Sequence, residues 1–523
     1  MTASIVQSYI NASNDGSKRK LLVCGPTNKS VVVLATRVIE QMSGTNLANF
    51  ALIGDKHELL VDNEQVLEPW FVYTVTKHWR KRWKRLQRHL LRHLDFDYFD
   101  DMSNALLLEM RRRLSSVRRL EEPVKNLTAL RLALPDLQEH EELSDSFDEA
   151  RKDREQLIND LFEDIDTQLK EMDEQELVKD LLDSADVVFC TLSSAGSMPV
   201  QRMHPADDLI VDEASAATVP EVFIPLHCQP KRLLLVGDPQ QLPPTVQSPL
   251  ALKYGLDESL QERLMKDNLK ENTQDFVLLD VQYRMNPAIS LWPMTKFYSG
   301  RVTDGDNVVS DRYKSQLAFF TSGDPYTWVA VTGKEEKDDN LSTFNESEAS
   351  AVVSILLDLK AASKGSKSLW CSPDALRVIT FYKAQVDRLR FLLMLYNLGY
   401  VVVSTVDSSQ GCEADVVVLS FVRGTSGHVG FLKDDRRLNV ALTRARRQLI
   451  CVGDLHALAG LEEVGGNLQV RELASDALSR AVIKQPGHLP PPPKKKTSQA
   501  PNSKNAKAPK KNKRSKKKKG GKK

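Results

Sequence analysis

The feature that most constrains this fold is the repeated alternation of short, almost wholly apolar segments with longer segments of helical periodicity. Apolar runs of strand length occupy residues 21–24, 186–190, 208–212, 232–236, 328–331, 377–381, 400–404, 415–420 and 448–452. Helical patterns occupy residues 2–11, 30–42, 345–360 and 383–396. Continuously apolar strands are buried on both faces, which is typical of parallel sheets covered by helices. We therefore predict an α/β protein in which two α/β blocks form two domains.

A segment of different texture, residues 55–183, interrupts the first block. Glycine is absent between Gly54 and Gly196, and leucines recur at helical spacing. Residues 77–92 hold eight Lys or Arg together with Trp79 and Trp83, whereas residues 136–180 hold 18 Asp or Glu against five Lys or Arg. We predict a helical insertion. Its basic stretch either touches nucleic acid or pairs with the acidic stretch, and their closeness in sequence favours pairing.

The charge of the chain is concentrated at its end. The formal net charge of +2 divides into +15 for residues 494–523, which contain no acid, and −13 for residues 1–493. After about Ile483 we expect order to fade, through a short polyproline spacer at 490–493 into a disordered Lys-rich tail. Such a tail attracts polyanions without reading sequence, and it also fits a nuclear-import or solubilising signal; these roles are compatible.

Composition excludes several classes of protein. With 41% hydrophobic and 27% charged residues over 523 positions, the chain is neither wholly disordered nor collagen-like. No apolar run approaches the roughly 20 residues that span a bilayer, and the N-terminus lacks a signal-peptide pattern. No two of the six cysteines form a C-x-x-C pair, which favours reduced thiols over metal ligation. We expect a protein of the nucleus or cytoplasm, with the basic tail favouring the nucleus, and no membrane partner.

The first chemical motif is an apolar strand, 209–211, that ends in Asp212 and Glu213. The carboxyl ends of parallel strands form the edge where α/β proteins bind ligands. There the first carboxylate can hold Mg²⁺ and the second can act on an attacking water.

Four further motifs follow in order. They are Gly237-Asp238-Pro239-Gln240-Gln241-Leu242-Pro243-Pro244, Gln282-Tyr283-Arg284-Met285-Asn286-Pro287, residues 404–415 (STVDSSQGCEAD) and residues 437–446 (RLNVALTRAR). With residues 209–215, these segments in this order resemble superfamily 1 helicases of the group that contains senataxin and the nonsense-mediated-decay helicase. The resemblance covers about residues 1–54 and 184–460.

The resemblance implies a fold and a domain division. It implies two RecA-like P-loop NTPase domains: a first, incomplete one from residues 1–54 and 184–255, and a second from residues 256–465. Residues 55–183 are then the helical insertion, and residues 466–523 a linker and the disordered tail. It also implies an ATP-dependent RNA or DNA helicase of 5′→3′ polarity, with ATP and Mg²⁺ as cofactors and single-stranded nucleic acid as partner; the sequence names no protein partner.

The resemblance also implies roles for individual residues. Asp212 resembles the Mg²⁺ ligand and Glu213 the general base. Gln241 resembles the γ-phosphate sensor, Tyr283 the aromatic that stacks on the base, and Arg284 and Arg444 the arginines that reach the γ-phosphate. The motif that joins nucleotide and nucleic-acid contacts is matched by Gln410, Gly411 and Glu413. Taken alone, Arg444 could be an ion-pairing arginine, Glu213 a helix N-terminal carboxylate and Tyr283 a core aromatic.

One motif of this family is missing. The phosphate loop G-x-x-x-x-G-K-[ST], whose backbone N–H groups cradle phosphates, does not occur in the sequence. The segment Gly25-Pro26-Thr27-Asn28-Lys29-Ser30 is too short, lacks the second glycine and loses a donor at Pro26. Residues 1–11 resemble the helix that follows the loop, so we expect an N-terminally incomplete chain that begins just after it. The strand before the loop would then be absent, and its neighbours in the first sheet would lack pairing and apolar contact.

Short polar side chains at strand ends resemble the strand-contacting motifs of the family. They are Pro26, Thr27, Asn28, Thr191, Ser194, Ser404 and Thr405. Such groups suit phosphates without reading sequence, although ordinary turn and capping chemistry explains any one of them alone. Asn345 and Glu348 we interpret as helix caps. Two functions therefore remain: a helicase represented by most of its motor, or an ATPase-dead nucleic-acid-binding pseudo-helicase or scaffold.

Overall fold

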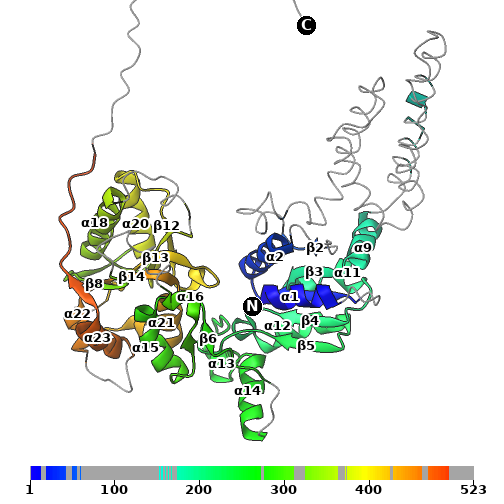
Figure 1. Cartoon of the computed structure of the whole chain (residues 1–523), viewed down its shortest axis with the longest axis horizontal. Helices are drawn as coiled ribbons and strands as arrows, with labels where there is room; N and C mark the ends of the chain where they lie inside the picture. The colour runs from blue at the N-terminus through cyan, green and yellow to red at the C-terminus, as the bar shows by residue number, and fades with distance from the viewer. Residues whose placement is uncertain are drawn as a thin grey trace, which may run out of the picture.

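A computed structural model describes residues 2–12, 19–42, 50–55, 174–271, 276–310, 324–362, 372–423 except 373, 428–461 and 469–493, with isolated residues between 59 and 167. Two parallel sheets dominate these residues and lie side by side in two bodies (Figure 1). The α/β class is therefore confirmed.

The first sheet has five parallel strands in the order β2-β3-β1-β4-β5. These strands are β1 (Leu21–Gly25), β2 (Phe50–Leu52), β3 (Val187–Thr191), β4 (Asp208–Val211) and β5 (Arg232–Leu235). The helices around them are α1 (Thr2–Ala12), α2 (Asn28–Met42), α9 (Glu174–Ser184), α10 (Leu192–Ala195), α11 (Met198–Gln201), α12 (Val219–Phe223), α13 (Pro249–Lys253) and α14 (Leu260–Glu271), with short 3-10 turns at Ala214–Ala216 and Ile224–Cys228.

Alternate strand residues bury opposite faces of this sheet. Leu21 and Val23 pack with α1 and α2, whereas Leu22 and Cys24 pack with α9 and the short helices after β3. This two-sided burial is the physical reason that the strands are continuously apolar in sequence. β5 departs from the pattern, since it lies at the sheet edge.

The second sheet has six parallel strands in the order β12-β11-β13-β14-β8-β15. These strands are β8 (Tyr326–Ala330), β11 (Leu376–Thr380), β12 (Val402–Thr405), β13 (Ala414–Ser420), β14 (Ala445–Gly453) and β15 (Val482–Lys484). Two small sheets, β6 (Val281–Gln282) with β7 (Thr303–Asp304) and β9 (Glu335–Lys337) with β10 (Thr343–Asn345), accompany it.

Helices cover both faces of the second sheet. α18 (Glu346–Ala362) and α20 (Lys383–Leu395) pack on one face. On the other face lie α15 (Pro287–Tyr298), α21 (Asp435–Leu442), α22 (Leu455–Ala459) and α23 (Gln469–Arg480). α16 (Asp306–Val309) and 3-10 turns at Asp407–Ser409 and Gly430–Lys433 complete the described elements.

The predicted start of the linker and tail at residue 466 needs correction. Residues 466–523 were expected to be linker and tail, and order was expected to fade after Ile483. Instead, α23 packs Val470 and Leu473 into the core of the second body, and β15 pairs with β8. Beyond the strand, Pro490 accepts a 2.6 Å hydrogen bond from the hydroxyl of Tyr396. The apolar side chains of α23, which recur at helical spacing before the prolines, could have predicted this packing.

The expected start of the second domain at residue 256 stays a prediction, and the helix that follows it contacts the first body. Leu260 at the start of α14 packs against the core of the first body, and the Gln261 side chain donates to the Gly237 carbonyl at 3.1 Å. Glu262 of the same helix pairs with Arg436 of the second body at 3.1 Å, so α14 contacts both bodies.

Most of the predicted insertion at 55–183, including Trp79 and Trp83, and the tail at 494–523 lie outside the described residues. Within the described part, no helix has the length and apolar character needed to cross a bilayer.

Candidate functional site

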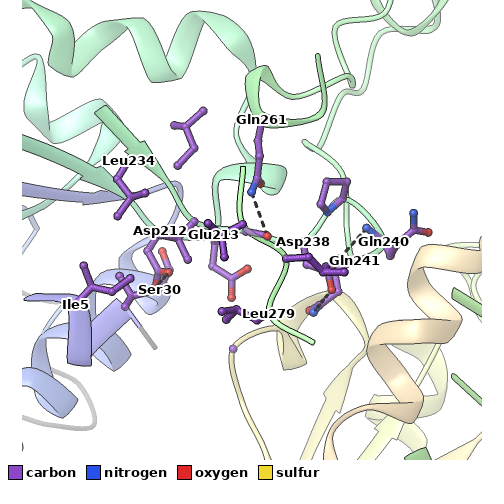
Figure 2. A pocket seen from close by; sticks show the side chains of 18 of the residues that line it. Ile5, Ser30, Asp212, Glu213, Leu234, Asp238, Gln240, Gln241, Gln261 and Leu279 are labelled. Atoms are coloured by element: carbon purple, nitrogen blue, oxygen red, sulfur yellow. Dashed lines mark hydrogen bonds between the residues drawn. The ribbon is translucent and has the colours of Figure 1, made fainter. Parts of the chain in front are cut away.

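A cavity of about 1260 Å³ lies where the carboxyl edge of the first sheet meets the second body. Seven of the nine residues predicted for the nucleotide site line it: Asp212, Glu213, Gln241, Arg284, Gly411, Glu413 and Arg444. Figure 2 shows Asp212 and Glu213 together at a strand end, and Asp238, Gln240 and Gln241 on a neighbouring loop. The structure thus brings together residues separated by more than 200 positions in sequence.

The carboxylate of Asp212 follows β4 directly. Its Oδ1 accepts a 2.7 Å hydrogen bond from the Thr2 hydroxyl, at the start of α1. Burial raises the pKa of Asp212, which Thr2, the Glu213 backbone and more distant cations partly offset. Sequence analysis assigned Thr2 to a helix without a site role. A site role for Thr2 could have been predicted from its hydroxyl, because Thr2 lies at the start of the helix that resembles the one after the phosphate loop.

Glu213 has backbone strain. Its φ of 53° lies in the left-handed region, which non-glycine residues adopt at a cost of about 1–3 kcal/mol. This conformation turns the chain sharply after β4, and the Glu213 carboxylate accepts a 3.1 Å hydrogen bond from Nε2 of Gln410 in the second body. Burial, together with the neighbouring Asp212 charge, raises the pKa of Glu213. A half-buried carboxylate with a raised pKa is suited to accept a proton.

Gln241 and Arg444 meet across the two bodies. NH2 of Arg444 lies 3.3 Å from Oε1 of Gln241, and its Nε donates to the Val440 carbonyl at 3.0 Å. The guanidinium is fully buried, and burial, followed by the positive charge of Arg284, lowers the pKa of Arg444 to about 10. Among the described residues no carboxylate forms an ion pair with Arg444, which argues against the ion-pairing alternative.

Arg284 and Glu413 form an ion pair at the site, although they are far apart in sequence. Nε of Arg284 donates to Oε2 of Glu413 at 2.6 Å, and Arg446 and Arg37 lie 3.4 and 4.0 Å from the other carboxylate oxygen. Although burial favours the neutral acid, these guanidiniums lower the pKa of Glu413. Arg37, on α2, is a cation at the cavity that sequence analysis missed, because nothing in a helical pattern marks one exposed arginine.

Tyr283 lies apart from these residues. Its side chain is 66% exposed, packs against Gly305 and is not among the residues that line the cavity. The alternative of a core aromatic is therefore wrong, and the stacking role stays a prediction. Gln410 is likewise outside the lining, although it contacts Glu213.

The predicted strand-contacting motifs share one local geometry. In each, a Thr at or just after the end of a strand forms a hydrogen bond with a Ser three residues later: Thr27 with Ser30, Thr191 with Ser194 and Thr405 with Ser408. These hydrogen bonds are those of capping turns, as expected if the Thr and Ser side chains have an ordinary turn or capping role. Lys29 joins two of the turns, since its ammonium donates to the Ser408 carbonyl.

The edge of the first sheet is uncovered beside the cavity. Leu233 and Leu234 of β5 are 39% and 41% exposed, and Leu278 and Leu279, which line the same cavity, are 38% and 52% exposed. The predicted loss of apolar contact beside an absent strand stays a prediction.

Comparison with known proteins identifies the family. Two family models, each described as an AAA domain, match residues 2–249 and 256–456. The chain belongs to the superfamily 1 helicases of the senataxin and nonsense-mediated-decay group. Three similar proteins represent this superfamily 1 group.

Helicase sen1 of Schizosaccharomyces pombe is 35% identical over 347 residues, which is 64% of this chain and 19% of that protein. A Regulator of nonsense transcripts 1 homolog of Drosophila melanogaster is 34% identical over 288 residues, 53% of this chain and 23% of the relative. The 5′-3′ DNA helicase ZGRF1 of Mus musculus is 35% identical over 285 residues, 53% of this chain and 14% of the relative. The chain therefore matches less than a quarter of the length of each.

Proposed function

We propose that this chain carries the motor of an ATP-dependent helicase that acts on single-stranded RNA or DNA. The observation that carries the proposal is the convergence on one cavity of Asp212, Glu213 and Gln241 from the first body with Arg284 and Arg444 from the second. Carboxylates from one domain and guanidiniums from another suit phosphoryl transfer, in which charge spreads over the γ-phosphate oxygens. Closure of the two bodies would bring both sets to the same nucleotide.

Each residue receives a role from its place. Glu213 accepts the proton of the attacking water, because its carboxylate has a raised pKa. Arg284 and Arg444 stabilise the developing charge, as rigid guanidiniums do in related chemistry. Gln241, held against Arg444, orients the γ-phosphate end of the nucleotide. Tyr283, exposed outside the cavity, is available to stack on the base.

The donor set fits Mg²⁺. Asp212 and Thr2 offer a carboxylate and a hydroxyl 2.7 Å apart, both hard oxygen ligands. No group of three His, Cys, Asp or Glu among the described residues could hold a metal by itself. Mg²⁺ usually binds through one or two protein carboxylates together with substrate phosphates and water, so a larger protein ligand set is not required. When bound, the ion would neutralise charge on the phosphates.

The turns at the strand ends are the proposed nucleic-acid contacts. We propose that Pro26, Thr27, Asn28, Thr191, Ser194, Ser404 and Thr405 contact its backbone. The relative named a 5′-3′ DNA helicase supports 5′→3′ polarity, and the Lys-rich tail supports a nuclear location and salt-sensitive binding.

A second candidate rests on one observation. The sequence contains no phosphate loop, so an ATPase-dead nucleic-acid-binding protein would share this surface. The two candidates make opposite predictions for nucleotide: only the motor changes its affinity for a single strand when ATP binds.

The test uses two proteins: this chain, and a version in which an apolar strand and the loop G-x-x-x-x-G-K are joined directly before Thr2. Strand displacement is measured on duplexes with a 5′ or a 3′ single-stranded overhang. The motor predicts ATP-dependent displacement of the 5′-overhang duplex by the loop-bearing protein. Binding of both duplexes with no displacement and no ATP effect would overturn the helicase proposal and support the scaffold.

A further inference from the structure

One side chain from the second body reaches the loop that carries Gln241. Tyr298 is the last residue of α15, and its hydroxyl donates a 2.6 Å hydrogen bond to Oδ2 of Asp238 in the loop after β5. The same Oδ2 accepts a 2.9 Å hydrogen bond from Nε2 of Gln241. One carboxylate oxygen therefore joins the second body to the amide of the proposed γ-phosphate sensor.

Tyr298 is itself held in place. Its ring packs against the core of the second body, and Nδ2 of the fully buried Asn439 donates to its hydroxyl at 2.9 Å. The same Nδ2 lies 2.9 Å from the Gln240 carbonyl, so Asn439 holds both sides of the contact. Burial, reinforced by the Asp238 charge, raises the pKa of Tyr298, so the hydroxyl stays protonated and remains a donor.

The remaining hydrogen bonds of Asp238 lie within the first body, including one that its backbone N–H donates to the Ser215 hydroxyl at 3.2 Å. Its Oδ1 accepts from the Gln240 backbone N–H at 3.0 Å, and its carbonyl accepts from the Gln241 N–H at 2.9 Å. These bonds form a turn but do not determine which way the Gln241 amide faces. With Nε2 held by Asp238, Oε1 is left toward Arg444 at 3.3 Å.

We propose that Tyr298 is a positioning residue that orients Gln241 through Asp238, so that docking of the second body determines the direction of the Gln241 amide. Without the Tyr298 hydroxyl, the Asp238 carboxylate loses its only contact with α15 among the described hydrogen bonds. The amide of Gln241 can then rotate away from Arg444 even when the two bodies are together. The kinetic part of this inference rests on the proposed ATPase function, whereas the structural part does not.

The test replaces Tyr298 by Phe, which removes one oxygen and keeps the ring in the core. The control is Tyr326→Phe, because Tyr326 is buried in the second body and its hydroxyl has no hydrogen-bond partner among the described residues. Hydrogen exchange of residues 237–244 is measured on the chain itself. We expect faster exchange in Tyr298→Phe, and rates unchanged from the parent in Tyr326→Phe.

Kinetics on the loop-bearing protein then test the role in orientation. We expect Tyr298→Phe to lower kcat between about tenfold and 100-fold with KM for ATP within about twofold, the size of losing a buried hydrogen bond to a charged group. In a Gln241→Ala background the same change should cost nothing further, because its effect passes through that amide. Unchanged exchange of the loop, or an undiminished kcat loss in the Gln241→Ala background, would overturn the proposal. If the parent hydrolyses no ATP, the proposed function fails, and loop exchange alone decides the claim for Tyr298.

Discussion

Replacement of Arg444 by Met tests whether this arginine acts in catalysis or only stabilises the fold. The guanidinium is fully buried, and its lowered pKa of about 10 means that the site disfavours its charge. A shift from 12.5 to about 10 corresponds to a cost of about 3 kcal/mol at roughly 1.4 kcal/mol per pKa unit. Against this stand hydrogen bonds to Val440, Cys412, Thr443 and Gln241, each worth about 0.5–1.5 kcal/mol net.

The four bonds together contribute about 2–6 kcal/mol, which largely offsets the cost of burial, so Arg444→Met should change the free energy of unfolding by less than about 3 kcal/mol. Replacing a buried charge with an apolar side chain of similar length is often neutral for stability. Activity should behave differently: the loop-bearing protein should lose about 10³-fold or more in nucleic-acid-stimulated kcat, the effect of removing an arginine that stabilises the γ-phosphate.

Urea unfolding and steady-state ATPase assays measure the two quantities on the same preparations. Arg444→Lys is the matched variant, since it retains a cation but lacks the planar fork and should recover little activity. A loss of stability above about 4 kcal/mol with activity within tenfold of the parent would refute the reasoning, because Arg444 would then be a structural residue.

Three further predictions concern other parts of the chain. Burial raises the pKa of the Glu348 carboxyl to about 8, so the folded state holds this proton more tightly than the unfolded state does. The contribution of Glu348 to stability should therefore be greatest below about pH 4.5. Between about pH 4.5 and pH 8 the free energy of unfolding should fall by about 1.4 kcal/mol per pH unit. Unfolding free energies of Glu348→Gln should lack this slope, and an equal slope in both proteins would contradict the assignment. The uncovered edge strand β5 should promote self-association of the chain. Leu234→Lys should therefore shift the chain toward monomer in sedimentation at micromolar concentration, whereas the control Leu478→Lys, at an equally exposed leucine on α23, should not. Equal association of both variants would refute a role for β5. Removal of residues 494–523 should flatten the dependence of single-strand affinity on salt, because 15 positive charges leave with the tail, and an unchanged slope would show that the tail makes no phosphate contacts.

Local signals predicted most of the fold. β1 and β13 differ from the predicted strands by one residue, because buried parallel strands carry an uninterrupted apolar run. β2 and β15 were missed, since three residues are too few to show a pattern. The contacts of α14 with the first body were not predicted, because the direction in which a connecting helix packs depends on tertiary contacts and not on its own sequence.

The site was predictable where a motif lies at a strand end. Asp212 and Glu213 follow β4 directly, so their place at the sheet edge follows from the strand itself. Tyr298 and Asn439 were not predictable as site residues, because their roles arise only when the second body meets the loop after β5. Arg37 illustrates the same limit: its helix was predicted, but its 4.0 Å approach to Glu413 joins two bodies.

The most direct measurement is the rate of ATP hydrolysis by the loop-bearing protein, with and without single-stranded RNA or DNA. The parent should be stimulated by the nucleic acid, and Glu213→Gln should reduce the stimulated rate by about 10²- to 10⁴-fold, the range for loss of a general base. Single-strand affinity should remain in both proteins. Hydrolysis that is absent in the parent, or that is equal in the parent and in Glu213→Gln, would contradict the assignment of this cavity as the ATPase site.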